Sequence, residues 1–317
     1  MKIIKNVEEI PAKLLNPAVT IGNFDGVHLG HREIFRRVKK SAAELVGDSV
    51  VITFIPHPLK VLAPDRGFRL ITTYEEKERL IEASGVGYLV TIPFTREFAA
   101  VSAEAFVRGI LLQKIGMKKL IIGYDYAFGR NREGDVTLLR RLGSEYDFTV
   151  EMLDQIGNGE TSFSSSAVRT LIEDGEVEKV VPFLGRYFSV KGGVVHGLNR
   201  GSRLGFPTAN IDAVEELLPK EGVYAVKVSY ADRNFDGACN IGFNPTFDSR
   251  KLTVEVNIFD FDGDLYGKEL KVHFVKRVRG DVKFSNVDAL KEAIASDVAF
   301  CRGVLSGISL LEYHEKG

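Results

Sequence analysis

Two histidines three residues apart, His28 and His31, are the residues whose type and spacing point most directly to chemistry. At this spacing two imidazoles lie on one face of the first turn of a helix. The free backbone N–H groups and the dipole of a helix N-terminus favour anions there. Gly30 has no Cβ, so a phosphate could approach the backbone closely. Imidazole N–H groups aimed at phosphate oxygens are what a phosphoryl-transfer transition state needs.

A histidine pair has two other interpretations, a metal site and an ordinary exposed helix start. A metal site needs a third ligand, and no neighbouring Cys or His supplies one. An HxxH pair alone would favour the ordinary helix start. The surroundings favour phosphate, because a β-branched run at 19–21, a glycine-containing turn at 22–26 and a helical apolar stripe from Ile34 to Leu45 come together.

The elements around this turn predict an α/β domain over residues 1–184. Short β-branched runs alternate with helical stretches, which is the pattern of a doubly wound fold with a mostly parallel sheet. Ligands of such folds bind beyond the carboxyl ends of the strands. The predicted strands cover residues 19–21, 50–55, 89–92, 120–122 and 148–153, and the predicted helices cover 73–84, 102–115 and 137–146.

Polar or glycine-rich segments follow several of these strands. His57 lies between two prolines that should stiffen the loop and hold the ring outward, although a plain strand exit is the alternative. The loop 123–135 mixes aromatic residues, glycines and arginines, which suits a planar heterocycle with a phosphate. Ser164 and Ser165 are natural N-caps of a helix, and Arg169 near its start would face the same anion as the backbone amides.

The hydrophobic pattern of the sequence changes after about Leu184, where apolar residues begin to recur at every second position. The alternating runs cover residues 224–230, 252–258 and 270–274, without crossover helices between them. Residues 260–264 are predicted to form a hairpin turn. We therefore expect an antiparallel β-barrel over residues 185–317, with one C-terminal helix at 287–301.

Two glycine-containing segments could contact phosphates. The run 157–159 lacks the third glycine of a dinucleotide loop and is predicted to be a simple turn. The stretch 191–210 has five glycines that could wrap phosphates, but it has no P-loop motif. Its Thr208 and Asn210 lie on one face if extended and offer oxygen ligands that suit Mg²⁺. A glycine-rich bend at a barrel corner explains this stretch equally well.

Glu255 is the candidate base of the second half. It lies between Thr253 and Asn257, on the polar face of an alternating strand. It is either a solvated carboxylate or a base that accepts a hydroxyl proton during phosphoryl transfer.

The segment GNFDGVHLGH, residues 22–31, resembles the first motif of the HxGH nucleotidyltransferases, in the form of the bacterial bifunctional riboflavin kinase/FAD synthetases. IGYDYAFGRNREGD and FSSSAVR are similar to the second and third motifs of that family, and TTYEEK and the Pro-His-Pro loop also fit. The resemblance implies a Rossmann-like domain that transfers AMP from ATP to FMN, giving FAD and pyrophosphate.

The same resemblance implies roles for individual residues. His28 and His31 would stabilise the α-phosphate as it becomes pentacovalent. Further ATP contacts would come from Gly22, Asn23, Phe24 and Asp25, and from Ser164, Ser165 and Arg169 on the β and γ phosphates. FMN would lie near His57, Pro58, Asp125, Phe128 and Arg130.

The second half resembles riboflavin kinase, so the two resemblances together cover nearly the whole chain. GLNRGSRLGFPTAN, LPKEGVYAVKV, NIGFNPTF, TVEVNIFDFDGDLYGKEL and RGDVKF occur in the family's order. The resemblance implies phosphorylation of riboflavin by ATP, with Mg²⁺ on Thr208 and Asn210 and with Glu255 deprotonating the ribityl hydroxyl. ATP would also contact His196, Gly197, Gly205 and Pro207, and the flavin would contact Arg279 and Phe284.

Composition limits the class of protein. The 42 basic and 43 acidic residues argue against a protein held on nucleic acid or on a membrane surface by a basic field. Cys239 and Cys301 form no CxxC motif, which predicts a reducing cytoplasm. The N-terminus has no apolar signal region, and no run of about 18 apolar residues occurs. We expect a cytoplasmic protein whose partners are small molecules.

Two other functions are alternatives to a bifunctional enzyme. One is an adenylyltransferase for another acceptor, such as pantetheine phosphate or nicotinamide mononucleotide, and the Pro-Thr-Ala-Asn segment argues against it. The other is a flavin-binding regulator that has lost catalysis. Retention of both histidines together with Thr208, Asn210 and Glu255 argues against that function.

Overall fold

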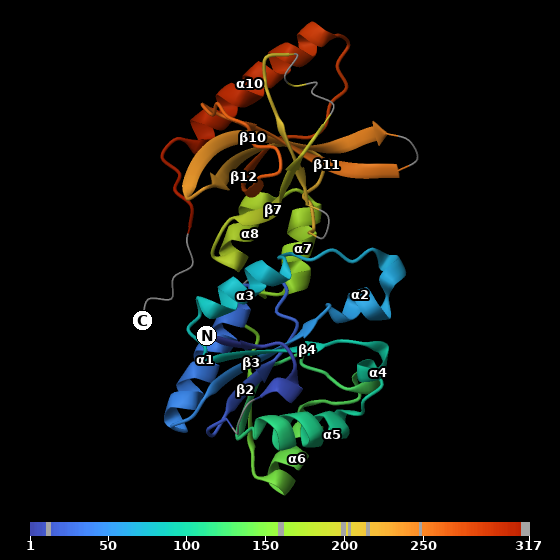
Figure 1. Ribbon diagram of the computed structural model, residues 1–317, viewed down its shortest axis with the longest axis vertical. Helices are drawn as coiled ribbons and strands as arrows, with labels where there is room; N and C mark the ends of the chain where they lie inside the picture. The colour runs from blue at the N-terminus through green and yellow to red at the C-terminus, as the bar shows by residue number, and fades with distance from the viewer. Residues whose placement is uncertain are drawn as a thin grey trace. The chain divides into compact units, whose positions relative to one another are not determined.

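The chain folds into two compact units (Figure 1). The computed structural model describes residues 1–10, 14–157, 162–197, 201, 204–213, 216–246 and 249–311, without the side chains of residues 244–246 and 249–251. Within these residues, the first unit comprises 1–68 and 74–164, and the second comprises 69–73 and 165–311.

Six parallel strands form the sheet of the first unit, in the order β1-β4-β3-β2-β5-β6. Five of them confirm the predicted strands, and only the three-residue edge strand β1 is too short to show a periodicity in the sequence. The strands are β1 (Lys2–Ile4), β2 (Ala18–Ile21), β3 (Ser49–Ile55), β4 (Tyr88–Pro93), β5 (Lys119–Gly123) and β6 (Thr149–Leu153).

Helices connect these strands and confirm the doubly wound α/β prediction. The predicted helix at 102–115 is present as α5 followed by a π-helix. The helices are α1 (Leu29–Glu44), α2 (Pro58–Leu62), α3 (Tyr74–Glu82), α4 (Arg96–Ala99), α5 (Ala103–Phe106), the π-helix (Val107–Ile115) and α6 (Val136–Tyr146). All four residues of β2 are buried, as expected of a central strand covered on both faces.

The strand order places β2 where the sheet reverses its direction of growth. After β2 the chain adds β3 and β4 on one side, and it then returns to add β5 on the other side. Ligands of open parallel sheets bind at such a switch point, beyond the carboxyl ends of the strands. The turn that carries His28 and His31 follows β2, and the loop 123–135 follows β5.

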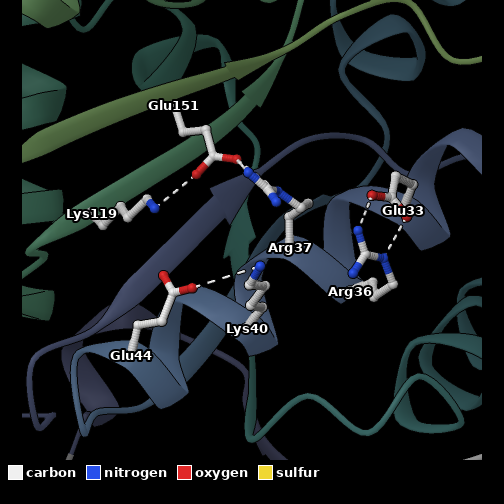
Figure 2. Close-up of polar contacts among 7 residues, drawn as sticks. All are labelled: Glu33, Arg36, Arg37, Lys40, Glu44, Lys119 and Glu151. Carbon is white, nitrogen blue, oxygen red and sulfur yellow. Dashed lines mark hydrogen bonds and ion pairs between the residues drawn. The ribbon is translucent and has the colours of Figure 1, made fainter.

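An ion-pair network links α1 to β5 and β6, the two strands at one edge of this sheet (Figure 2). Glu151 on β6 accepts a hydrogen bond from Arg37 Nε on α1 at 2.7 Å, and it pairs with Lys119 Nζ on β5, also at 2.7 Å. Burial opposes ionisation of Glu151, but the hydrogen bonds from Lys119 and Arg37 outweigh it, so the pKa of Glu151 lies below its usual value. On the exposed side of α1, Arg36 pairs with Glu33.

Six antiparallel strands close the barrel of the second unit, in the order β10-β11-β8-β7-β12-β9. The predicted barrel and its C-terminal helix are thereby confirmed. The elements are β7 (Phe188–Val195), β8 (Ala209–Asp212), β9 (Gly222–Tyr230), β10 (Arg233–Thr246), β11 (Ser249–Ile258), β12 (Glu269–Arg279), α7 (Ser165–Glu173), α8 (Val177–Leu184) and α10 (Val287–Leu305).

The predicted hairpin at residues 260–264 is wrong. The segment joins β11 to β12, and these two strands are not neighbours in the barrel, because β8 and β7 lie between them. Strand alternation reveals which residues share a face, but it does not reveal which strands pair.

Two further predictions concern the domain boundary and the glycine-containing segments. Contacts group α7 and α8 with the barrel, where α8 packs on β12 and β7. The boundary between residues 184 and 185 stays a prediction. Asn158 and Gly159 of the predicted turn, and residues 198–200 and 202–203 of the glycine-rich stretch, lie outside the described residues.

Candidate functional site

The turn after β2 brings two histidine rings face to face. The ring centroids of His28 and His31 are 3.6 Å apart, with 24° between the ring planes. His28 is the N-cap of α1, since its Nδ1 accepts the backbone N–H of His31 at 3.4 Å. A neutral His28 therefore carries its proton on Nε2. A Cβ on Gly30 would lie 3.0 Å from the His28 ring, a tight contact that would require the ring to shift.

His31 has the electrostatics of a ligand-binding group. Burial, followed by the positive charges of His28 and Lys77, holds the pKa of His31 well below its usual value. The Phe24 ring packs edge-on against the His31 ring, with the ring centroids 5.1 Å apart. Its Nδ1 is buried and has no hydrogen-bond partner within the described part of the chain. A buried nitrogen without a partner is uncommon in folded proteins, so this atom is a candidate for contact with a ligand.

The turn between β2 and α1 is strained. Phe24 and Val27 have φ values of 49° and 41°, in the left-handed region that disfavours residues with side chains, β-branched ones most of all. Both side chains are buried. Such strain costs of order 1–3 kcal/mol per residue and gathers at functional sites, where surrounding structure holds it.

Lys77 is a polar residue beside this turn that the sequence marks only as the end of the TTYEEK segment, with no role of its own. Its ammonium group donates to the Asn23 carbonyl and to Thr53 Oγ1, both at 3.1 Å. Burial lowers its pKa to about 8, although Asp25 and Glu78 act in the opposite direction. A signal was present in the sequence, because a lysine occupies the apolar face of α3 with the spacing of a core residue.

The prediction that His57 points outward is wrong. The side chain is buried, and its ring stacks on Phe68 with centroids 4.3 Å apart. The backbone N–H of His57 donates to Tyr74 Oη at 2.8 Å, and Nδ1 accepts the backbone N–H of Leu59 at 3.2 Å. His57 thus caps α2, in which Pro58 occupies the first position. Cap geometry, and not only proline stiffness, orients the ring.

The predicted flavin-side residues after β5 have different surroundings. Asp125 and Arg130 are exposed. Phe128 is buried, with its ring centroid 5.4 Å from Tyr126 and 5.9 Å from Phe106. Phe128 therefore belongs to the core of the unit, and contact with a flavin stays a prediction for all three.

The third motif begins beside the histidine turn. The Phe163 carbonyl is 3.3 Å from the position that a Cβ on Gly30 would take. Ser164 belongs to the first unit, whereas Ser165 and Arg169 lie on α7 in the second. The guanidinium of Arg169 donates to the Arg69 carbonyl at 2.8 Å.

A cavity of about 330 Å³ lies between the barrel wall and α10. Val254 and Val256 are fully or almost fully buried, so the alternation of β11 turns Glu255 to the other face, where it lines this cavity. Four predicted kinase residues line the cavity, together with apolar side chains of α10 and the barrel: Thr208, Glu255, Arg279 and Phe284.

Polar neighbours surround Glu255 on its face of the barrel. The register pairs it with Asn210 on β8 and with Asn240 on β10, and paired residues point to the same face. Asn257, two residues along, donates its amide to the Pro207 carbonyl at 2.7 Å. This hydrogen bond ties the Pro-Thr-Ala-Asn segment to the strand that carries Glu255.

Arg279 forms another part of the cavity lining. Its Nε and Nη2 donate to the Asp297 carboxylate on α10, at 3.0 and 2.8 Å. The guanidinium carbon lies 5.5 Å from the centre of the Phe284 ring. A planar cation beside an aromatic ring and an apolar helix suits a flat heterocycle.

A second cavity, of about 490 Å³, lies on the other side of Thr208. Pro207 and Thr208 line it, together with the loop 261–266. The His196 ring stacks on Tyr266 of that loop, with centroids 4.0 Å apart. Thr208 therefore borders both cavities.

Glycines bring the backbone against both predicted magnesium ligands. A Cβ on Gly197 would lie within 2.7 Å of the Asn210 amide, and a Cβ on Gly201 would lie 3.2 Å from the Thr208 side chain. Gly205 has a φ of 88°, which glycine adopts without strain. Within the described ranges no cluster of three His, Cys, Asp or Glu could hold a metal.

Both halves of the chain match known families. Residues 11–167 match the FAD synthetase family, and residues 184–305 match the riboflavin kinase family. The chain is 36% identical to the bifunctional riboflavin kinase/FMN adenylyltransferase of Buchnera aphidicola subsp. Schizaphis graminum, over 94% of this chain and 97% of that protein. The protein of the same name from Escherichia coli K12 is also 36% identical, over 94% of this chain and 96% of that protein.

A solved structure has the same arrangement of elements. It is described as a macrolide-efflux protein from Streptococcus pneumoniae, and its TM-score is 0.84 at 32% identity, over 95% of this chain and 98% of that chain. Among the residues described here, no helix is both long and apolar enough to cross a membrane.

Proposed function

Because the chain belongs to the family of bifunctional riboflavin kinase/FMN adenylyltransferases, we propose that separate residue sets carry its two reactions. The enzyme phosphorylates riboflavin with ATP to FMN, and it transfers AMP from ATP to FMN to give FAD. The kinase site lies around Thr208 and Glu255, and the adenylyltransferase site lies around His28 and His31.

One observation carries the kinase assignment, which is that Thr208 borders two cavities. ATP occupies the cavity beside Pro207, with its phosphates toward Thr208 and near His196, Gly197 and Gly205. Riboflavin occupies the cavity beneath α10, with its ring system against Arg279 and Phe284. The γ-phosphate and the ribityl hydroxyl then meet at Thr208.

Glu255 acts as the general base at that meeting point. The ribityl oxygen forms a bond to the γ-phosphorus, the bond to the bridging oxygen of ADP breaks, and the hydroxyl proton passes to a carboxylate oxygen of Glu255. Asn210 and Asn240, its neighbours in register, support the position of the carboxylate. A positioned base typically contributes ~100–10,000-fold to the rate.

Thr208 and Asn210 would hold Mg²⁺ in the kinase site. A hydroxyl and an amide oxygen are hard ligands that suit this ion, and substrate phosphates complete its shell. The close approach of Gly197 to Asn210 and of Gly201 to Thr208 supports the assignment, because any larger residue would fill that space. When bound, the ion neutralises phosphate charge.

The histidine pair carries the adenylyl transfer. A phosphate oxygen of FMN attacks the α-phosphorus of ATP, and pyrophosphate leaves. His28 and His31 donate N–H groups to the α-phosphate as its charge develops. Gly22, Asn23, Phe24 and Asp25 form the turn beside it.

The remaining substrate contacts of the adenylyltransferase are proposed from the family motifs. Ser164, Ser165 and Arg169 bind the leaving phosphates. His57, Pro58, Asp125, Phe128 and Arg130 lie on the FMN side.

We place both reactions in a reducing cytoplasm with small molecules as partners. Cys239 and Cys301 are buried free thiols, and burial raises the pKa of both, which supports a compartment that does not oxidise them. The near balance of acidic and basic residues supports the absence of a nucleic-acid partner.

Two substitutions in the full chain test the separation of the sites. Glu255→Gln should keep riboflavin affinity and lower FMN formation by ~100-fold or more, because shape is preserved but the base is lost. His31→Ala should lower FAD formation from supplied FMN by ~100-fold or more. Each variant should retain the other activity within a few-fold. The measurements are the two rates, by chromatographic separation of the flavins, and riboflavin affinity by flavin fluorescence.

Equal loss of both activities in either folded variant would contradict the two-site proposal. A kinase rate within a few-fold of the parent in Glu255→Gln would mean that Glu255 is a solvated strand residue.

A further inference from the structure

The helix α3 places a charged residue on the face that packs into the core. Its buried side chains are Lys77, Leu80 and Ile81, and Lys77 is only 4% exposed. Removing an ammonium group from water costs several kcal/mol. Buried titratable groups at the edge of a ligand site often serve the function of that site. The two reactions described above do not use Lys77.

The contacts of Lys77 converge on the backbone that leaves β2. Its Nζ donates to the Asn23 carbonyl and to Thr53 Oγ1 on β3, both at 3.1 Å. Thr53 Oγ1 in turn lies 3.3 Å from the same carbonyl. These three groups meet at the carboxyl ends of two neighbouring parallel strands, where ligands of this fold class bind.

Asn23 directly precedes the strained part of the turn. Phe24 and Val27, both with positive φ, lie between it and His28. A strained turn keeps its conformation only when surrounding contacts hold it. The hydrogen bond from Lys77 to Asn23 holds the turn at its first residue.

The same helix also holds the loop that follows β3. The Tyr74 ring lies one turn earlier on α3, with its centre 5.3 Å from Lys77 Nζ. Its hydroxyl accepts the backbone N–H of His57 at 2.8 Å. One side of α3 therefore links the histidine turn to the Pro-His-Pro loop.

The charge of Lys77 acts on the histidine pair as well. Burial, His28 and Lys77 together lower the pKa of His31. Asp25 and Glu78 favour the charged form of Lys77, and burial opposes it. A bound polyphosphate would add negative charge and favour the ammonium form further.

We propose that Lys77 is a positioning residue for adenylyl transfer, which holds the turn 23–27 and thereby places His28 and His31 toward the α-phosphate. This inference rests on the assignment of adenylyl transfer to the histidine site. Lys77 acts through the Asn23 carbonyl and not by contact with the reacting atoms.

Three substitutions in the full chain test the proposal. Lys77→Met keeps the length of the side chain and removes the charge and the donors, and Lys77→Arg keeps a cation. Arg79→Met is the matched control, because Arg79 lies on the same helix with its side chain 57% exposed and paired with Glu76. We expect Lys77→Met to lower kcat/KM for FAD formation by ~10–100-fold, as displaced catalytic groups do. Lys77→Arg should recover part of this loss, and Arg79→Met should match the parent.

Riboflavin kinase activity of the same samples separates positioning from general loss of fold. We expect it to stay within a few-fold of the parent, because its site lies in the other unit. The titration of His31, followed by NMR on histidine-labelled protein and assigned with His31→Gln, is the second readout. Its pKa should rise in Lys77→Met and stay low in Lys77→Arg.

FAD formation within three-fold of the parent in Lys77→Met would overturn the proposal. An equal fall of both activities with a lower melting temperature would also overturn it, since Lys77 would then only support the fold.

If Lys77→Met does not fold, Thr53→Val removes the second acceptor of Lys77 Nζ and the Thr53 contact to Asn23, and it should lower FAD formation by ~3–10-fold. An unchanged rate in Thr53→Val would then overturn the proposal. Loss of FAD formation in His31→Ala without loss in Lys77→Met would reject this inference alone, whereas no loss in His31→Ala would reject the histidine site itself.

Discussion

Arg279 shows how a single residue can join two parts of a cavity wall. Its guanidinium forms two hydrogen bonds to Asp297 on α10 while one face approaches the Phe284 ring. A planar fork can do both at once, whereas a lysine ammonium cannot. Asp297 is itself almost fully buried, so this ion pair is largely shielded from water. The residue type therefore matters more here than the charge.

Arg279→Lys should weaken riboflavin binding and leave the chemical step nearly intact. We expect KM for riboflavin to rise by ~5–50-fold, with a smaller change in kcat, because the cavity wall loosens while Glu255 keeps its place. Steady-state kinase kinetics measure both constants. Arg302→Lys is the matched control, since Arg302 on α10, the helix that carries Asp297, makes a similar two-point contact to Asp260 outside the cavity. An equal effect of the two substitutions on KM would refute a specific role for Arg279.

At the scale of elements, one carboxylate with two cations links α1 to β5 and β6 (Figure 2). Glu151 bridges Arg37 and Lys119, and its side chain is only 20% exposed. The pair of Glu33 and Arg36 on the same helix is more exposed and lies within one element. Exposed pairs of this kind stabilise by only a few tenths of a kcal/mol.

Glu151→Gln should lower the free energy of unfolding by about 1–3 kcal/mol at pH 7, because two partly buried cations lose their shared partner. Glu33→Gln, the control, should change it by less than about 0.5 kcal/mol. The pKa of Glu151 is lower in the folded than in the unfolded chain, so its contribution is present above the unfolded value and is lost as the pH falls through the folded value. Urea denaturation at pH 7 and near pH 3 measures this. A difference between parent and Glu151→Gln that does not shrink in acid would argue against the ion pair.

At the scale of the whole molecule, the residues proposed for the kinase reaction all lie in the second unit. The helix α8 belongs to the barrel unit, and its buried residues include Val180, Phe183 and Leu184. It packs on β12 and β7. A kinase fragment that begins after α8 would therefore expose an apolar surface on the barrel.

Two fragments test the domain boundary. A fragment of residues 185–317 should phosphorylate riboflavin without making FAD, because the Thr208 and Glu255 site is complete in it. A fragment of residues 165–317 should do the same with a higher melting temperature, because it keeps α8 on the barrel. Kinase assays and thermal denaturation of both fragments, beside the full chain, measure this. Inactivity of both fragments, with an active full chain, would show that the kinase needs the first unit.

The sequence by itself determined the local parts of this enzyme. The spacing of His28 and His31 after a β-branched run, the alternation around Glu255 and the Thr208–Asn210 pair follow from the periods of helices and strands. Those periods settle which side chains share a face, whatever the rest of the fold does. The match of these stretches to family motifs then identified both reactions.

Only the tertiary structure decided what lies against those residues. Lys77 reaches the Asn23 carbonyl across 54 positions of sequence, and β3 supplies the hydroxyl beside it. Thr208 borders two cavities and directly precedes β8, which the barrel places between β11 and β7. His57 is buried because an aromatic ring from a later segment covers it. Each of these depends on which distant segments pack together, and side-chain periodicity carries no information about that.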